Sequence, residues 1–166
     1  PASGELWTPR GASRSRSPPP LPPTGRAALL ELPPSAPHLV ALLSSSDVET
    51  RRHAALALGN LAMEPSGRAI LLEVYTLLPE LVRALQDLDL DCRRGAAMAL
   101  GNMLTEAETR FRLLQVVAAA RALTEQLKSP DRLLVRYATG ALRNLAVDDR
   151  GRRSLLANQE AVAALK

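Results

Sequence analysis

The chain has 166 residues, of which 46% are apolar and only 2% aromatic, so its core has to be built from Leu, Ala and Val. This composition favours helix. The net charge of +4 comes from the two ends, because residues 39–131 carry ten basic and twelve acidic side chains, and a nucleic-acid-binding protein is therefore not expected.

The first 24 residues form a leader rich in Pro, Ser and Arg, which is predicted to be disordered or extended. The leader contains an R-x-x-P-x-x-P pattern, which is typical of polyproline segments that bind SH3-type domains, at Arg16, Pro19 and Pro22. Such short matches often arise by chance, so a plain linker is the leading interpretation. Phosphorylation would change the local charge from basic to acidic at three serines in an Arg/Ser-Pro context, Ser13, Ser15 and Ser17.

The rest of the chain repeats with a period of 42 residues. The motif LALGN returns as MALGN and then as GALRN, and ten further positions match in all three copies without a gap. Ten of the thirteen prolines precede residue 38, which leaves the later residues free to be helical. A period of this length built from helices indicates a solenoid, in which each unit buries its apolar face against its neighbours.

Each unit is predicted to contain three helices. In the first complete unit a short helix covers residues 39–43, a long one residues 48–62, and a third lies around residues 68–73. The long helix of each unit is preceded by an aspartate that can accept a hydrogen bond from its first amides: Asp47, Asp89 and Asp131. Alanines at two matched positions of these helices are expected to let adjacent units approach closely.

The segments AALALGNLA, GAAMALGNML and YATGALRNLAVDDRGRR resemble the third helix and following turn of armadillo repeats. The resemblance covers residues 25–166 and implies an all-α, right-handed α-solenoid of three-helix repeats. Its expected divisions are a partial repeat with one first helix (25–38), three repeats (39–80, 81–122 and 123–164) and the start of another (165–166). We therefore expect a part of a longer array that is monomeric when full length.

The resemblance also implies a binding site. In armadillo proteins the long third helices line a concave groove, and a repeated Asn hydrogen-bonds the backbone of an extended peptide. The residues in that position are Asn60, Asn102 and Asn144, although each could instead bond its own helix end or an adjacent loop. Helical spacing places further side chains on the same stripe, where they are expected to line the groove: Glu49, His53, Leu56, Asp91, Met98, Tyr137 and Gly140.

The residue four positions before each asparagine separates the subfamilies. Importin alpha, the nuclear-signal receptor of the armadillo family, has Trp there, whereas this chain has Leu56, Met98 and Gly140. The sequence TGALRNLA is closer to armadillo-only adaptors of the vacuolar-membrane type and to plant ubiquitin-ligase arrays. These relatives are scaffolds, so the resemblance implies a scaffold that binds extended protein segments.

No catalytic or cofactor-binding cluster is apparent, so an enzyme is not expected. The only two histidines, His38 and His53, have no partner at metal-ligand spacing, and the single cysteine, Cys92, permits no disulfide. A repeated arginine could present a basic ladder to an acidic partner, but bracing of neighbouring units is the favoured interpretation for Arg52, Arg94 and Arg136.

The predicted function is therefore that of a non-enzymatic protein-interaction scaffold. The alternatives are a nuclear-transport adaptor of the importin-alpha type and a basic, HEAT-like solenoid that binds nucleic acid. An intracellular and more specifically cytoplasmic setting is expected. No apolar run is long enough to span a bilayer, so membrane association would need an anchor outside this chain.

Overall fold

The structure is a computed structural model that describes residues 35–157, and every regular element in this range is helical. The predictions for the leader, for its SH3-type motif and three serines, for residues 25–34 and for residues 158–166 lie outside the described residues.

The helices follow one another in repeating order. Two helices come first, α2 (Ser35–Leu42) and α3 (Val48–Leu61). The next unit contains α4 (Pro65–Leu72), α5 (Leu77–Ala84) and α6 (Leu90–Met103). The last complete unit contains α7 (Ala107–Leu113), α8 (Ala119–Glu125) with a following 3-10 turn (Gln126–Lys128), and α9 (Arg132–Leu145), after which comes α10 (Asp149–Ala157).

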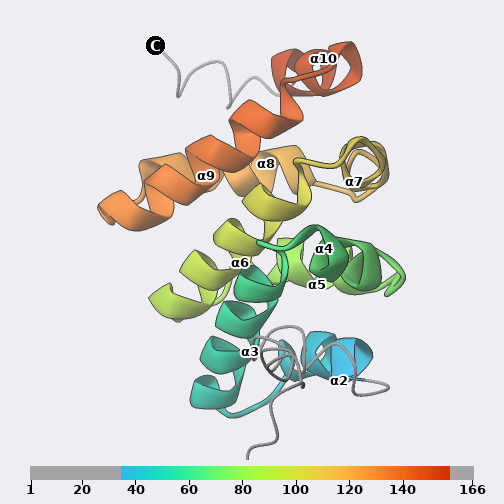
Figure 1. Cartoon of the computed structure of the whole chain (residues 1–166). Helices are drawn as coiled ribbons and strands as arrows, with labels where there is room; N and C mark the ends of the chain where they lie inside the picture. Colours follow the sequence, from blue (N-terminus) through green and yellow to red (C-terminus); the bar gives the residue numbers. More distant parts are fainter. Residues whose placement is uncertain (1–34, 158–166) are drawn as a thin grey trace, which may run out of the picture.

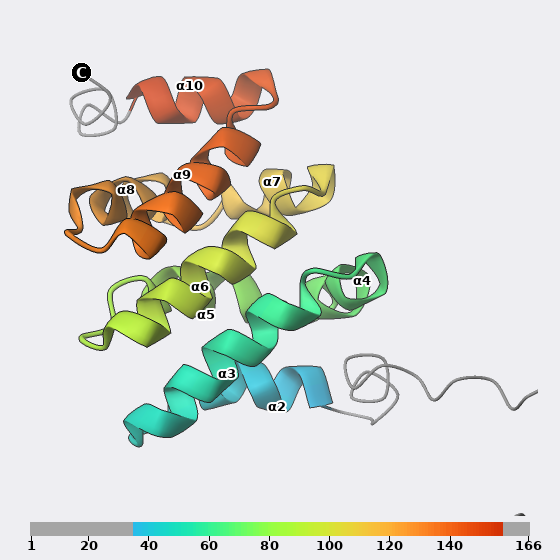
Figure 2. The same cartoon turned by 60° about the vertical axis from the view of Figure 1, so that its left-hand side comes forward.

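The long helices α3, α6 and α9 lie side by side in one layer, with the short helices in a second layer behind them (Figures 1 and 2). Helix α6 packs against α3 on one side and against α9 on the other. Units therefore stack in chain order, as the 42-residue period predicted, and the all-α solenoid is confirmed. The surface formed by α3, α6 and α9 is called the long-helix face below.

The core between the units is aliphatic. Leu58 and Leu100, which occupy the same position in successive units, are both 0% exposed. The matched alanines also pack inside: Ala54, Ala96 and Ala138 are buried. Small residues bring the helices close together, because no bulky side chain separates their backbones.

The three predicted N-cap aspartates are confirmed. The Asp47 carboxylate accepts a hydrogen bond from the Thr50 amide at 2.7 Å. Asp89 and Asp131 bond the amides three residues later at 2.9 and 2.7 Å. Each of these bonds satisfies an amide that has no partner within its helix, which explains why all three long helices begin at the same register position.

The short helices begin earlier than the sequence suggested. Helix α2 starts at Ser35 instead of residue 39, and α5 starts at Leu77. Pro37 and Pro79 lie in the first turns of these helices, where no amide is needed for the intrahelical ladder, so proline is tolerated there. The predicted repeat boundaries remain a prediction, and they fall inside α2, α5 and α8.

Candidate functional site

The long-helix face contains a hollow of about 380 Å³ between the first halves of α3, α6 and α9. All three helices contribute to it, so it exists only when successive units are stacked. It is lined by Glu49, Arg52, His53, Leu56, Asp91, Arg94, Gly95, Met98, Leu133 and Tyr137. The structure thus brings together the residues that helical spacing had predicted for a groove, apart from Gly140 and the three asparagines.

The asparagines lie in the last turn of each long helix and are half-buried. Asn102 Nδ2 donates a hydrogen bond to the Gly59 carbonyl oxygen at 3.1 Å, and Asn144 Nδ2 donates to the Gly101 carbonyl oxygen at 2.9 Å. These acceptors belong to the long helix of the preceding unit, a partner that sequence reasoning did not consider. For Asn60 the equivalent acceptor would be residue 17, outside the described residues.

This bond leaves part of each amide unused. An Asn side chain has two N–H donors and a carbonyl oxygen with two lone pairs, and the bond to the preceding unit uses one donor. The oxygen of Asn144 accepts from Arg143 at 3.1 Å. Asn102 makes no other side-chain hydrogen bond to the described residues, so one N–H and its oxygen remain available to a ligand.

The repeated arginines on this face form inter-unit ion pairs. Arg52 Nη2 lies 2.6 Å from an Asp89 carboxylate oxygen, and its Nη1 bonds Glu49 one turn earlier. Arg94 contacts both oxygens of Asp131, at 3.0 and 2.5 Å, and also bonds Asp91 at 2.7 Å. In these two units the arginine therefore braces its neighbour through the aspartate that caps the next long helix.

The ion pairs shift the pKa values of the carboxyl groups involved. The hydrogen bond from Arg94, assisted by the Leu134 amide, lowers the pKa of Asp131 to about 2. The hydrogen bond from Arg52 lowers the pKa of Asp89 even further, although burial opposes this effect. Both carboxylates therefore stay charged at pH values somewhat below 3.8, where an ordinary aspartate becomes protonated.

The third arginine differs. Arg136 occupies the same register position on α9, but it is exposed and makes no ion pair with any residue in the range 35–157. The residue one turn before it is Leu133, where the two earlier units have Glu49 and Asp91. Two of the three arginines proposed for a basic ladder therefore bind acids of the neighbouring unit within the described residues.

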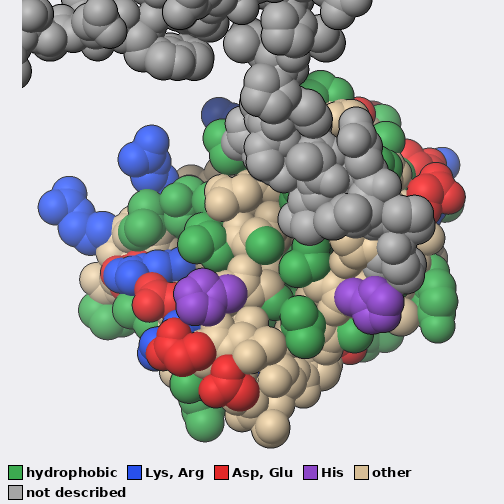
Figure 3. Space-filling model, turned by 60° about the horizontal axis from the view of Figure 1, so that its bottom comes forward, with side chains coloured by type: hydrophobic (Ala, Val, Ile, Leu, Met, Phe, Trp, Pro, Cys, Tyr) green, Lys and Arg blue, Asp and Glu red, His purple; other side chains and the backbone are tan. Residues whose placement is uncertain are grey.

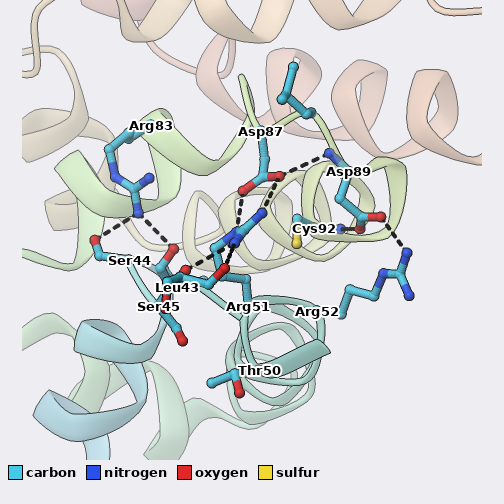
Figure 4. Close-up of polar contacts among 12 residues, drawn as sticks. Leu43, Ser44, Ser45, Thr50, Arg51, Arg52, Arg83, Asp87, Asp89 and Cys92 are labelled. Carbon is cyan, nitrogen blue, oxygen red and sulfur yellow. Dashed lines mark hydrogen bonds and ion pairs between the residues drawn. The ribbon is translucent and has the colours of Figure 1, made fainter. Parts of the chain in front are cut away.

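Further arginines join the units away from the long-helix face. Arg51 pairs with Asp87 at 2.8 Å and also donates to the carbonyl oxygen of Ser45 (Figure 4). Arg68 and Arg110 donate to the free carbonyls at the end of the preceding long helix and pair with an acid of the next unit, at 2.8 and 3.0 Å. A recurring separation of 36 to 38 residues between arginine and acid was the sequence signal for these inter-unit contacts.

Glycines on the long-helix face differ in how much space surrounds them. A Cβ on Gly95 would lie 2.7 Å from Ala55 Cβ and 2.8 Å from the Ala55 carbonyl carbon, so α6 approaches α3 closely there. A Cβ on Gly140 would meet nothing within 4 Å. The face therefore has open space on α9 at the position where α3 and α6 carry Leu56 and Met98.

The described residues include neither a reactive cysteine nor a cluster of metal ligands. Cys92 is buried, and burial raises the pKa of its thiol to about 12, so it is not a reactive thiolate. Within residues 35–157 no three His, Cys, Asp or Glu side chains come together as metal ligands. Among the helices of this range, none is both long and apolar enough to cross a membrane.

The stacked units define a class of protein, the α-solenoids built from helical repeats. Among solved structures, an engineered protein matches with a TM-score of 0.65 and 27% identity over 78% of this chain and 50% of that one. A designed armadillo repeat protein in complex with the peptide (KR)4 matches with a TM-score of 0.71 and 24% identity, over 79% and 55% of the two chains.

A third structure concerns a phosphorylation switch in the interaction between cadherin and beta-catenin. Its TM-score is 0.67 at 26% identity, over 74% of this chain and 23% of that one. The present chain spans about half the length of the first two structures. No curated protein matches its sequence.

A family model for HEAT repeats matches residues 36–143, which is more than half of the chain. The chain belongs to the HEAT-repeat family, and its fold is shared with designed armadillo repeat proteins. The resemblance to armadillo repeats is thereby confirmed at the level of the armadillo and HEAT class.

Proposed function

We propose that the protein is a non-enzymatic interaction scaffold that binds an extended protein segment along its long-helix face. The observation that carries the proposal is the hollow shared by α3, α6 and α9, which contains polar and apolar side chains from three successive units. Ligand sites in proteins are typically concave, with a mainly apolar lining and a few placed polar groups. Leu56, Met98 and Tyr137 supply the apolar part here.

The asparagines would hold the backbone of such a segment. The free N–H and oxygen of Asn102 match the C=O and N–H of one residue in an extended segment, which point to the same side of the chain, and this pairing needs no charge. Its bond to Gly59 fixes the side chain in one orientation, so less conformational entropy is lost when a ligand binds. The designed armadillo protein bound to (KR)4 shares this fold and supports a peptide ligand by analogy.

Two observations argue against the alternatives, which are a nuclear-import signal and a nucleic acid. The tryptophans of importin alpha are replaced by Leu56, Met98 and Gly140, and the acids of α3 and α6 offset their arginines. We further propose an intracellular, cytoplasmic setting, with the free thiol of Cys92 as its support.

The proposal can be tested by filling the open space on α9. Peptides are first selected on the immobilised chain from a random peptide display library, and their affinities are measured by fluorescence anisotropy. Gly140→Leu should weaken the selected peptides roughly tenfold or more, because the new side chain occupies space that the ligand needs. The variant should remain folded, since nothing lies within 4 Å of its Cβ.

Glu73→Leu provides the matched control, because this residue is exposed at the end of α4, in the layer of short helices. Equal affinities for the wild-type chain and the Gly140→Leu variant would contradict binding on the long-helix face. Asn102→Ala is less suitable as the first test, since it also removes an inter-unit hydrogen bond.

A further inference from the structure

Helices α3 and α6 carry an arginine at a second matched position, which is Arg51 on α3 and Arg93 on α6. The Arg51 guanidinium donates to the carbonyl oxygens of Ser45 and Ser46, at 2.9 and 3.2 Å, in the turn before its own helix. Its Nε and Nη2 reach the next unit and bond the Asp87 carboxylate at 2.8 and 3.2 Å (Figure 4). Arg51 therefore joins the starts of two successive long helices.

Arg93 makes only the first half of this contact. Its Nη1 donates to the carbonyl oxygens of Asp87 and Leu88, at 2.6 and 3.0 Å, in the turn before α6. Within residues 35–157 it forms no ion pair with an acid. The residue that corresponds to Asp87 in the next unit is Ser129, so the register places a neutral hydroxyl where Arg51 meets a carboxylate.

In other respects the two interfaces are built alike. The next arginine along each helix, Arg52 or Arg94, bonds the N-cap aspartate of the following unit. Asp87 Oδ1 also accepts a hydrogen bond from the N-cap amide of α6 at 2.9 Å, and Ser129 Oγ accepts one from the N-cap amide of α9 at 3.2 Å. The Ser129 oxygen thus replaces one oxygen of Asp87, and the interface lacks only the negative charge.

The sequence around Ser129 is that of a kinase substrate. Ser129 precedes Pro130, and a serine followed by proline is the pattern that proline-directed protein kinases modify. Proline disfavours the helical region for the residue before it, and Ser129 has an extended backbone, with φ −66° and ψ 139°. The serine is half-buried, and the residues on both sides of it, Lys128 and Pro130, are exposed. This turn is therefore presented at the surface.

We infer that Ser129 is a phosphorylation site whose phosphate forms an inter-unit ion pair with Arg93. In the modification the Ser129 hydroxyl oxygen attacks the γ-phosphorus of ATP, and the bond from this phosphorus to the β–γ bridging oxygen breaks. ADP leaves, and the hydroxyl proton passes to a carboxylate of the kinase. The phosphate carries a charge of about −1.5 to −2 and three acceptor oxygens, two of which match the guanidinium fork. The inference does not depend on the proposed function.

The protein already contains a brace of this kind. In the preceding unit Asp87 and Asp89 lie two residues apart, and each bonds its own arginine, so two negative charges are accommodated at the start of one long helix. Charges of opposite sign also lie next to one another on the surface that Figure 3 shows, at the end of the stack formed by α2 and α3. Phosphorylation of Ser129 would add the matching brace between α6 and α9, and its removal would release it.

The first experiment tests the site. The full chain and a synthetic peptide of residues 122–136 are incubated with ATP and a proline-directed kinase, and proteolytic fragments are analysed by mass spectrometry. Both should gain a phosphate on Ser129. A peptide that is phosphorylated while Ser129 of the folded chain stays unmodified would overturn the assignment, because the folded turn would then be closed to the kinase.

The second experiment tests the ion pair by phosphorus NMR of the phosphorylated chain, with the resonance assigned by its loss in Ser129→Ala. The second pKa of phosphoserine is ordinarily about 6, and Arg93 should make it lower in the folded chain than in the peptide by roughly 0.5 or more. Arg93→Gln should remove this difference. Arg112→Gln, which changes an exposed arginine on the short helix α7, should preserve it.

A phosphate pKa that does not respond to Arg93→Gln, in a variant that circular dichroism shows to be folded, would overturn the ion pair. Hydrogen exchange gives an independent measurement. Phosphorylation should slow exchange of the amides in the first turn of α9 roughly threefold or more in the wild type, and it should have no such effect in Arg93→Gln. Equal slowing in both chains would also contradict the brace.

Discussion

At the junctions between helices, the close approach of two backbone segments determines which residue type can be accommodated. A Cβ on Gly67 would lie 2.0 Å from the Leu61 carbonyl oxygen, and one on Gly151 would lie 1.7 Å from the Leu145 oxygen. Both glycines pack against the last turn of a long helix, and the equivalent residue of the middle unit is Thr109, which is fully buried. Backbone atoms cannot move aside as a flexible side chain can, so glycine is required where the junction is tightest.

At this scale we predict opposite effects for two glycine substitutions. Gly67→Ala should lower the free energy of unfolding by roughly 1–3 kcal/mol, because the added methyl group overpacks the junction. Gly140→Ala should raise it by about 0.4–1 kcal/mol, because nothing lies within 4 Å of its Cβ and the unfolded chain loses freedom. Urea unfolding measures both, and a stabilised Gly67→Ala variant would refute the close approach.

At the scale of the element, one carboxylate has two functions at the start of α6 and again at the start of α9. Asp131 caps α9 through the Leu134 amide and also receives the fork of Arg94 from the preceding unit. Asp89 caps α6 through the Cys92 amide and accepts a single hydrogen bond from Arg52 Nη2. The helix N-terminus favours a negative charge by its dipole as well, so capping and unit stacking reinforce each other.

This arrangement predicts sensitivity to acid. The pKa of Asp131 in the folded protein is about 2, below the ordinary value of 3.8, so its stabilising contribution is present above pH 3.8 and is lost as the pH falls toward 2. Asp131→Asn keeps a capping side chain but removes the charge. Urea unfolding at successive pH values should therefore show a shallower loss of stability for Asp131→Asn than for the wild type between about pH 4 and pH 2. Parallel curves would show that Asp131 does not contribute through its charge.

For the whole molecule, stability depends on contacts between neighbouring units. Helix α6 has a long helix packed on both sides, whereas α9 has one only on the α6 side among the described residues. Leu100 on α6 is 0% exposed, and Leu142, its counterpart on α9, is only partly buried. In a repeat protein of this kind stability is approximately a sum of unit and interface contributions.

We therefore expect the middle of the stack to tolerate cavities least. Leu100→Ala should cost roughly 2–5 kcal/mol of unfolding free energy, and Leu142→Ala should cost clearly less, because less apolar surface and a smaller cavity are involved. Hydrogen exchange should be slowest in the amides of α6. Equal costs for the two substitutions would indicate that the ends of the described stack are as well packed as its centre.

Several features could be predicted from the sequence, because each depends on local pattern and helical register. They are the period, the N-cap aspartates, the long helices and most core positions. The start of each long helix is indicated by an N-cap aspartate: Asp47, Asp89 and Asp131. The spacing of Ala and Leu indicates the buried sides of these helices. The early start of α2 and α5 was not predicted from the sequence. Proline usually interrupts a helix, but it is tolerated in the first turn, where its missing N–H is not needed.

Only the tertiary structure determined which groups the polar side chains of the long helices bond in the neighbouring units. The sequence placed Asn102 and Arg94 on their helix, but their bonds to Gly59 and Asp131 depend on how one unit is rotated against the next. The same rotation assembles the hollow from three helices. Local periodicity fixes which side chains share a stripe, whereas the packing between units fixes which of their polar groups remain free for a ligand.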